Sequence, residues 1–214
     1  DLVRHFIVFE DEGGGKLIKK MAGYHQFHAV NVAVEETLRA ARRAAEHQTA
    51  EAMGTYKAGH QAGGEPGDRR VGVVWHTQGS GKSYSMAFFA EKVRRTVEGN
   101  FTFVLMTDRD DLDSQIYKTF VGCGVADDQT PRAGSGRELE QLLKQNHRYV
   151  FSLIHKFNQD VAPDEPYSAR DDIIVVSDEA HRTQSGKLAR TMRMALPNAA
   201  FIGFTGTPLF KHDQ

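Results

Sequence analysis

The sequence predicts an α/β fold in which helices cover both faces of a mainly parallel sheet, a three-layer α/β/α arrangement. From residue 71 onward, short apolar runs rich in Val, Ile and Phe alternate with amphipathic stretches. The runs are nearly continuous rather than alternating, as is typical of strands that are buried on both faces. Polar segments follow several of the runs, at the strand ends where parallel sheets bind their ligands.

Five runs are predicted to be strands. They are VGVVW (71–75), FTFVLMT (101–107), YVFSLI (149–154), DIIVVS (172–177) and AAFIGF (199–204). Helical spacing of apolar residues predicts helices over 82–95 and 137–146. An earlier helical pattern runs from His28 to Gln48. We therefore expect an N-terminal helical extension (1–48), a flexible glycine-rich excursion without chemistry (49–70) and one α/β domain (71–214).

Composition excludes several classes of protein. Lys plus Arg number 27 against 28 Asp plus Glu, so any nucleic-acid surface must be a local patch. The single cysteine, Cys123, rules out an internal disulfide framework and a cysteine-rich zinc site. No apolar run approaches the roughly 20 residues that a membrane helix needs, and the sequence predicts no membrane partner.

A phosphate-binding loop is predicted at Thr77–Ser83, between a strand and a helix. Gly79, Ser80 and Gly81 let backbone N–H groups converge on phosphate oxygens at a helix start. Lys82 would reach the β- and γ-phosphates, and the Ser83 hydroxyl would bind Mg²⁺. His76 stands where the strict pattern has its first glycine, and a plain glycine-rich turn is the alternative.

Two acidic residues follow the fourth predicted strand. Asp178 comes at the end of a buried run, where a carboxylate is costly unless it meets a cation. We expect Asp178 to hold Mg²⁺ and Glu179 to act as the catalytic base that polarises the attacking water. An ordinary helix N-cap is the alternative.

The segment GFTGTPLF (203–210) forms a third polar strand end. Thr205 and Thr207 offer hydroxyl groups on a stiff turn, and we expect them to couple the nucleotide site to a distant surface. Taken alone, the segment is merely a turn.

The motifs GSGKS, DEAH and TGTP, in this order, resemble motifs I, II and III of superfamily 2 helicases and translocases, whose motor core is a pair of RecA-like domains. HTQGSGKS, TDRDDLDSQ, SDEAHRTQSG and GFTGTPLF resemble more closely the motor subunit of type I restriction endonucleases, along essentially the whole chain. That family tolerates a histidine at the position of His76. The resemblance implies a RecA-like fold with ATP and Mg²⁺ as cofactors.

The same resemblance assigns further residues. Gln26, in YHQFHAVN, corresponds to the adenine-reading Q motif, with a purely structural role at a helix start as the alternative. His181 would link the magnesium site to the TGTP segment. Arg109 and Lys156 would contact DNA, but Arg109 lies among aspartates that suit a helix cap, and a lone lysine at a strand end is usually just solvated.

The resemblance implies that this chain is the first RecA-like domain of a DNA translocase. Such a motor pulls double-stranded DNA with ATP before the full-length subunit cleaves it, and it works with specificity and methyltransferase subunits in a bacterial or archaeal cytoplasm. A nuclease domain and a second RecA-like domain would complete it, so this region alone should turn ATP over poorly. The alternatives are another superfamily 2 helicase or translocase, and an ATP-gated binding module that does not hydrolyse.

Overall fold

A five-stranded parallel sheet forms the centre of the computed structural model, which describes residues 1–41, 64–158, 161–162, 164–178 and 186–207. The strands are β3 (Arg70–Trp75), β4 (Thr102–Thr107), β5 (Tyr149–Leu153), β6 (Ile173–Asp178) and β7 (Ala200–Thr205), in the order β3-β7-β6-β4-β5. Every pairing is parallel. The five predicted strands and the three-layer α/β/α class are thereby confirmed. β4, β5 and β6 are buried along their whole length, whereas the edge strand β3 is partly exposed, with Trp75 56% exposed.

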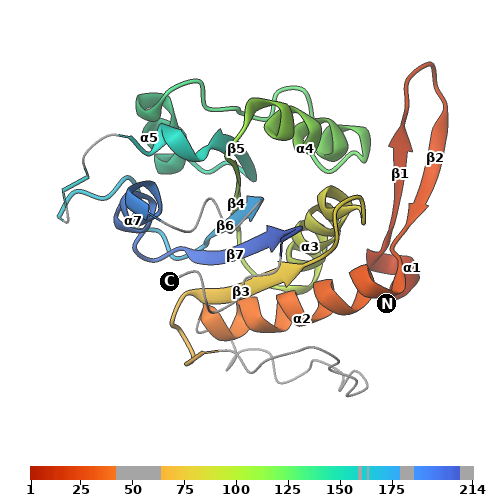
Figure 1. The fold of residues 1–214 in the computed structure, drawn as a ribbon, viewed down its shortest axis with the longest axis horizontal. Helices are drawn as coiled ribbons and strands as arrows, with labels where there is room; N and C mark the ends of the chain where they lie inside the picture. Colours follow the sequence, from red (N-terminus) through yellow and green to blue (C-terminus); the bar gives the residue numbers. More distant parts are fainter. Residues whose placement is uncertain (42–63, 159–160, 163, 179–185, 208–214) are drawn as a thin grey trace.

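Two apolar clusters lie on opposite faces of the sheet. One joins helices α2 (Tyr24–Ala40), α3 (Lys82–Thr96) and α4 (Asp110–Gly122) to side chains such as Phe103 and Leu105. The other joins α5 (Gly136–Lys144) and α7 (Gly186–Ala195) to Val104 and Met106. Since neighbouring residues of β4 face opposite clusters, the alternation of a strand explains why the whole run is apolar. Figure 1 shows α5 and α7 on one side of the sheet and α3 on the other.

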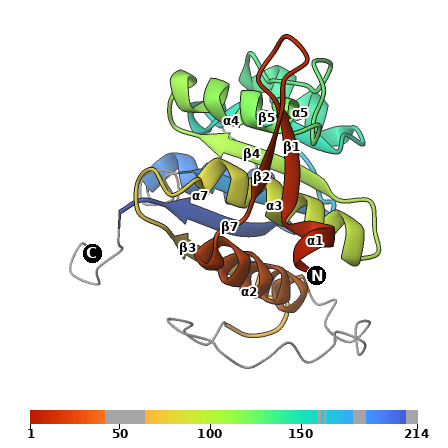
Figure 2. The ribbon, with the colours of Figure 1, turned by 90° about the vertical axis from the view of Figure 1, so that its right-hand side faces the viewer.

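The N-terminal region differs from the predicted helical extension. A short helix, α1 (Leu2–His5), leads into an antiparallel hairpin of β1 (Ile7–Asp11) and β2 (Leu17–Met21). The hairpin stands beside α3 and α4 (Figure 2). The sequence held one signal for this hairpin, the run of glycines at 13–15, and all three have positive φ in the turn between the strands.

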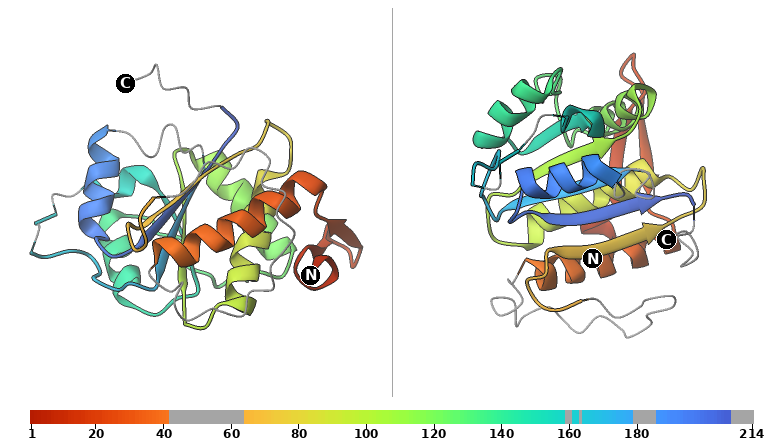
Figure 3. Two further views of the ribbon diagram at one scale, coloured as in Figure 1. Left: turned by 90° about the horizontal axis from the view of Figure 1, so that it is seen from below. Right: turned by 60° about the vertical axis from the view of Figure 1, so that its left-hand side comes forward.

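Helix α2 begins at Tyr24, four residues before the predicted start, and is described as far as Ala40. It packs along β3 and α3 (Figure 3). Its buried residues Val30 and Val34 share a cluster with Phe6, Phe88 and Phe204. Residues of the N-terminal region and of the sheet therefore share one apolar core.

Only residues 64–70 of the predicted excursion are described. They are fastened to the end of α2 by Arg39, whose guanidinium donates to the backbone carbonyls of Glu65 and Arg70 and to the carboxylate of Asp68. The backbone of Gly67 also donates to the Arg39 carbonyl. Hydrogen bonds with Arg39 thus hold the return of the chain into β3.

The remaining short element is a 3₁₀ turn, η1 (Ile154–Lys156), directly after β5. In the part of the chain that the structure describes, no helix is long and apolar enough to cross a membrane.

Candidate nucleotide site

The predicted phosphate loop connects β3 to α3 at the carboxyl edge of the sheet. Gly79 and Gly81 both have φ of 80°, in the left-handed region that favours glycine. Gly81 is the N-cap of α3, a 15-residue helix, and it gives the helix no side-chain cap. The first N–H groups of a helix have no acceptor within the helix, so they can donate to an anion here. Ser80 lies inside the loop, and its Oγ is buried and has no hydrogen-bond partner among the described residues.

Lys82 and Ser83 are the first two residues of α3. The side chain of Lys82 reaches the turn after β7, because a Cβ added to Gly206 would lie 3.1 Å from Lys82 Nζ and 3.7 Å from the backbone nitrogen of Gln78. The absence of a side chain at residue 206 therefore lets the turn approach both the lysine and the loop. The structure brings together two motifs that the sequence places more than a hundred residues apart.

Strand register brings the acidic motif to the same edge. Val74 pairs with Phe204, and Phe204 pairs with Asp178, so the ends of β3, β7 and β6 are level. Asp178 is the last residue of β6 and is 6% exposed. Neighbouring strands are about 4.8 Å apart, which places Asp178 two strands from the start of the phosphate loop. Glu179 and His181 lie outside the described residues.

Thr205 and Thr207 are both in place after β7. Thr205 is fully buried; its Oγ1 donates to the carbonyl of Thr207 and accepts from the Thr207 N–H, each at 3.2 Å. The indole Nε1 of Trp75 donates to the Gly206 carbonyl at 3.4 Å. The turn is thus built by its own hydroxyl group and attached to the strand that carries the phosphate loop.

Gln26 lies in the first turn of α2 and is 7% exposed, and both ends of its amide bond to protein groups. Oε1 accepts from the Gly23 N–H at 2.8 Å, while Nε2 donates to the Gly81 carbonyl at 3.0 Å and to Ser85 Oγ at 3.2 Å. This geometry is that of the structural alternative, and the adenine-reading role stays a prediction. Sequence reasoning missed that Gln26 touches the phosphate loop, 55 residues away.

His76, the residue that departs from the strict loop pattern, is 8% exposed. Its backbone N–H donates to the Thr205 carbonyl and continues the pairing of β3 with β7. Its ring lies 4.9 Å from the ring of His25, centroid to centroid, in an edge-to-face contact. Burial, followed by the nearby His25 and Lys82, lowers the pKa of His76 below its ordinary value.

The two predicted DNA contacts lie at the same edge but are engaged with the protein. Arg109 is the N-cap of α4, and its guanidinium donates to both carboxylate oxygens of Asp111 at 3.1 and 3.0 Å. Acidic residues fill the first turn of that helix, as the helix-capping alternative requires. Lys156 Nζ donates to the Gly134 carbonyl at 2.7 Å. A role for either residue in binding DNA stays a prediction.

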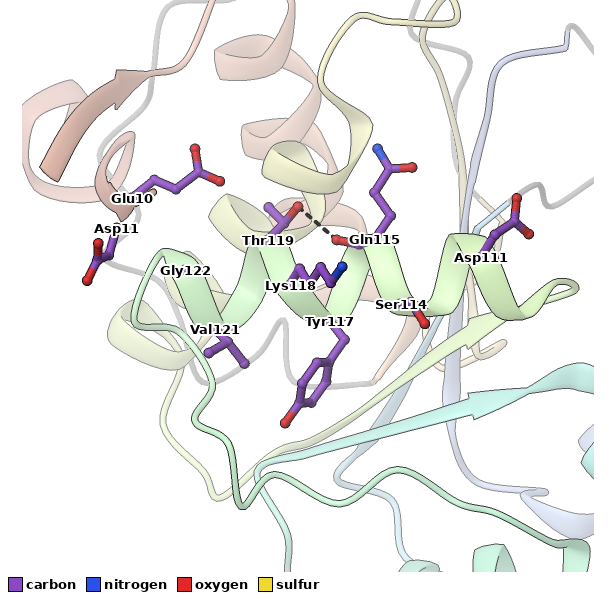
Figure 4. A pocket seen from close by; sticks show the side chains of 10 residues that line it. All are labelled: Glu10, Asp11, Asp111, Ser114, Gln115, Tyr117, Lys118, Thr119, Val121 and Gly122. Carbon is purple, nitrogen blue, oxygen red and sulfur yellow. Dashed lines mark hydrogen bonds between the residues drawn. The ribbon is translucent and has the colours of Figure 1, made fainter. Parts of the chain in front are cut away.

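A groove of about 610 Å³ lies elsewhere, between the hairpin and α4 (Figure 4). Three carboxylates and one lysine line it, together with uncharged residues: Glu10, Asp11, Asp111, Ser114, Gln115, Tyr117, Lys118, Thr119, Val121 and Gly122. None of the predicted site residues belongs to it. It is therefore a separate feature of the surface.

A family model described as SWI2/SNF2 ATPase matches residues 25–214. The chain belongs to the SWI2/SNF2 ATPase family. Membership implies nucleotide binding, for which the loop geometry is suited. The resemblance predicted from the four motifs is also confirmed, because the chain is homologous to endonuclease subunits of type I restriction enzymes.

Two of these relatives come from different domains of life. The chain is 43% identical, over its full length, to the type I restriction enzyme HindI endonuclease subunit of Haemophilus influenzae. It is 37% identical, over 92% of its length, to the putative MjaIXP endonuclease subunit of Methanocaldococcus jannaschii. It covers 20% and 17% of these relatives, so this SWI2/SNF2 ATPase chain spans about a fifth of their length.

Solved structures confirm the RecA-like fold. The UvsW helicase of bacteriophage T4 matches 96% of the chain with a TM-score of 0.57 at 17% identity, and the chain covers 57% of it. The ATP-dependent Type ISP restriction-modification enzyme LlaBIII, bound to DNA, matches 97% with a TM-score of 0.53 at 15% identity, and the chain covers 14% of it. These likenesses concern the arrangement of strands and helices in the SWI2/SNF2 ATPase chain.

Proposed function

We propose that this SWI2/SNF2 ATPase domain binds ATP at Thr77–Ser83 and hydrolyses it to move double-stranded DNA, as a motor part of a type I restriction enzyme. The observation that carries the proposal is the convergence of three strand ends on one edge. The phosphate loop with its uncapped helix start, Asp178, and the turn after Thr205 all lie there. The homology to type I endonuclease subunits supports DNA as the polymer that is moved.

Each loop residue has a distinct role in this proposal. The backbone N–H groups of Gly79 through Ser83 would hold the phosphates, since the glycines have the backbone conformation that turns successive amides inward. Lys82 would neutralise the β- and γ-phosphates, and its position beside Gly206 would make it sensitive to the turn after β7. Gln26 would still read the adenine edge if its amide exchanged one protein partner for the base.

Mg²⁺ fits the donor set at this edge. The Ser83 hydroxyl lies at the start of α3, and the Asp178 carboxylate is buried at the end of β6, both oxygen ligands of the kind that Mg²⁺ prefers. When bound, the ion would withdraw charge from the phosphates. Glu179 follows Asp178 directly in the sequence and would take the proton of the attacking water.

Coupling to DNA would pass through the neighbouring strands. Thr205 and Thr207 would relay the state of the γ-phosphate, with His181 linking them to the acidic motif. Arg109 and Lys156 would approach the DNA backbone after exchanging their present protein partners for phosphates. Specificity and methyltransferase subunits would complete the assembly in the cytoplasm of a bacterium or archaeon.

ATP turnover is the experiment that tests this function. We would measure the ATPase activity of the parent-length protein with linear duplex DNA, with single-stranded RNA and without nucleic acid. Glu179→Gln should retain nucleotide binding but lose turnover, and Lys82→Ala should lose both. Stimulation by duplex DNA supports the proposal. Stimulation by RNA alone would indicate another superfamily 2 helicase, and binding without turnover would indicate an ATP-gated module.

A further inference from the structure

Two histidines lie behind the phosphate loop, and neither has a role in the proposed reaction. His25 is the second residue of α2 and is exposed, whereas His76 is buried at the end of β3. Their rings meet at 4.9 Å with an interplanar angle of 80°. His76 occupies the position at which a strict phosphate loop has glycine. Its contact with His25 offers a physical reason for this departure from the pattern.

His25 is bonded to the loop itself. Its Nε2 lies 3.2 Å from the carbonyl oxygen of Ser80. A carbonyl can only accept, so Nε2 must carry the proton in this arrangement. The next carbonyl along the chain, that of Gly81, accepts from Gln26 Nε2 at 3.0 Å. Two successive peptide groups of the loop are therefore attached to the first turn of α2.

Attachment of these carbonyls orients the opposite side of each peptide. In a planar trans peptide the C=O and N–H bonds point in opposite directions. Holding the carbonyls of Ser80 and Gly81 toward α2 therefore directs the N–H groups of Gly81 and Lys82 away from it. Those two N–H groups belong to the set that would meet phosphate oxygens, so α2 fixes the loop from the side that the nucleotide does not touch.

The N-terminus of α2 leaves room for this contact. A Cβ added to Gly23 would lie 3.0 Å from Cε1 and 3.2 Å from Nδ1 of His25. The φ of Gly23 is −69°, which any residue can adopt. Space for the imidazole, rather than backbone conformation, is therefore what favours glycine at this N-cap.

We propose that His25 and His76 are positioning residues that hold the phosphate loop in its phosphate-binding shape, His25 through the Ser80 carbonyl and His76 by supporting the His25 ring. The inference concerns the same site as the proposed function and rests on phosphate binding there. Burial keeps the pKa of His76 low, so its ring is neutral near pH 7 and adds no second cation beside Lys82.

Hydrogen exchange of the nucleotide-free protein tests the loop shape directly. His25→Phe keeps a ring against His76 but removes the donor, and amides of residues 77–82 should exchange about five-fold faster, as expected for one lost hydrogen bond. His25→Gln should restore slow exchange, because its amide nitrogen is as many bonds from Cβ as Nε2 of histidine. His28→Phe, three residues further along α2, is the control. Unchanged exchange in His25→Phe would overturn the proposal.

Nucleotide affinity gives the second readout. The Kd for ATP should rise about five-fold in His25→Phe and in His76→Ala, and it should recover in His25→Gln and in His76→Phe. If His25→Phe and His76→Ala bind ATP with the same Kd as the unaltered protein, the positioning role is refuted. If the unaltered protein binds no ATP, and Lys82→Ala makes no difference, the proposed function fails, while the exchange rates still decide whether the two histidines hold the loop.

Discussion

Two glycines of the phosphate loop provide a matched pair of substitutions. Gly79 and Gly81 have the same φ, 80°, in the left-handed region that disfavours alanine at both positions. A Cβ at Gly79 would meet nothing within 4 Å, whereas a Cβ at Gly81 would lie 3.0 Å from Gln26 Nε2. The difference between the two variants therefore isolates the contact between Gln26 and the loop.

The expected magnitudes follow from these two contributions. A left-handed backbone costs an alanine about 1–2 kcal/mol, and this is the full effect predicted for Gly79→Ala on the free energy of unfolding. Gly81→Ala also displaces Nε2, which donates to the Gly81 carbonyl and to Ser85 Oγ. Two weakened hydrogen bonds add about 1–2 kcal/mol, so Gly81→Ala should cost about 2–4 kcal/mol in all.

Urea denaturation of the nucleotide-free protein is the suitable assay, because added methyl groups could also obstruct the phosphates. Gln26→Ala provides the second side of a double-mutant cycle. In the Gln26→Ala background, the cost of Gly81→Ala should fall to that of Gly79→Ala. Equal costs for the two glycine variants in the unaltered protein would refute the reasoning, as would an excess at Gly81 that persists without Gln26.

Three further predictions concern other parts of the molecule. Gly206→Ala should weaken ATP binding several-fold with little loss of stability, because its methyl group would lie 3.1 Å from the mobile end of Lys82; unchanged affinity in a titration would contradict the contact. Burial, and then the charges of Lys92 and Arg95, lower the pKa of His5 from 6.5 to about 4. The folded state therefore resists protonation, and stability should fall by about 1–3 kcal/mol as the pH drops from 6.5 toward 4, a slope that thermal unfolding should show and His5→Phe should reduce. Phe89 is fully buried against Phe103 and Phe204. Phe89→Ala should therefore lower the free energy of unfolding by about 3–5 kcal/mol. A loss under about 1 kcal/mol in urea denaturation would contradict this and mean that the cluster repacks.

The sheet could be predicted because its signal is local. Each strand is an apolar run of the right length, and the phosphate loop announces itself by glycines beside Lys82. The hairpin was missed because its two five-residue strands, IVFED and LIKKM, do not alternate apolar and polar residues. They are also short beside the continuous runs, and the long helical pattern that follows outweighed them.

The attachment of α2 to the loop could not have been predicted from the residues alone. Gln26 and Gly81 are 55 residues apart, and no periodicity indicates which helix passes behind a loop. The resemblance to helicase motifs directed Gln26 toward the nucleotide base, whereas in the structure its amide bonds to the loop backbone. For Arg109 the residues alone were the better guide. The aspartates around it suggested a helix cap rather than a DNA contact, and its guanidinium pairs with Asp111 at the start of α4.

Phe6 lies nineteen residues before the start of the family match, yet it is fully buried and its ring contacts those of Phe27 and Phe88. A shortened protein that began at residue 25 would keep the phosphate loop and the acidic and TGTP motifs, but it would lose Phe6 from the core between α2 and α3. Its apolar helix faces would then be open to solvent, and to other copies of the chain. The segment that packs into this core is therefore longer than the segment that the family match marks, because it includes Phe6.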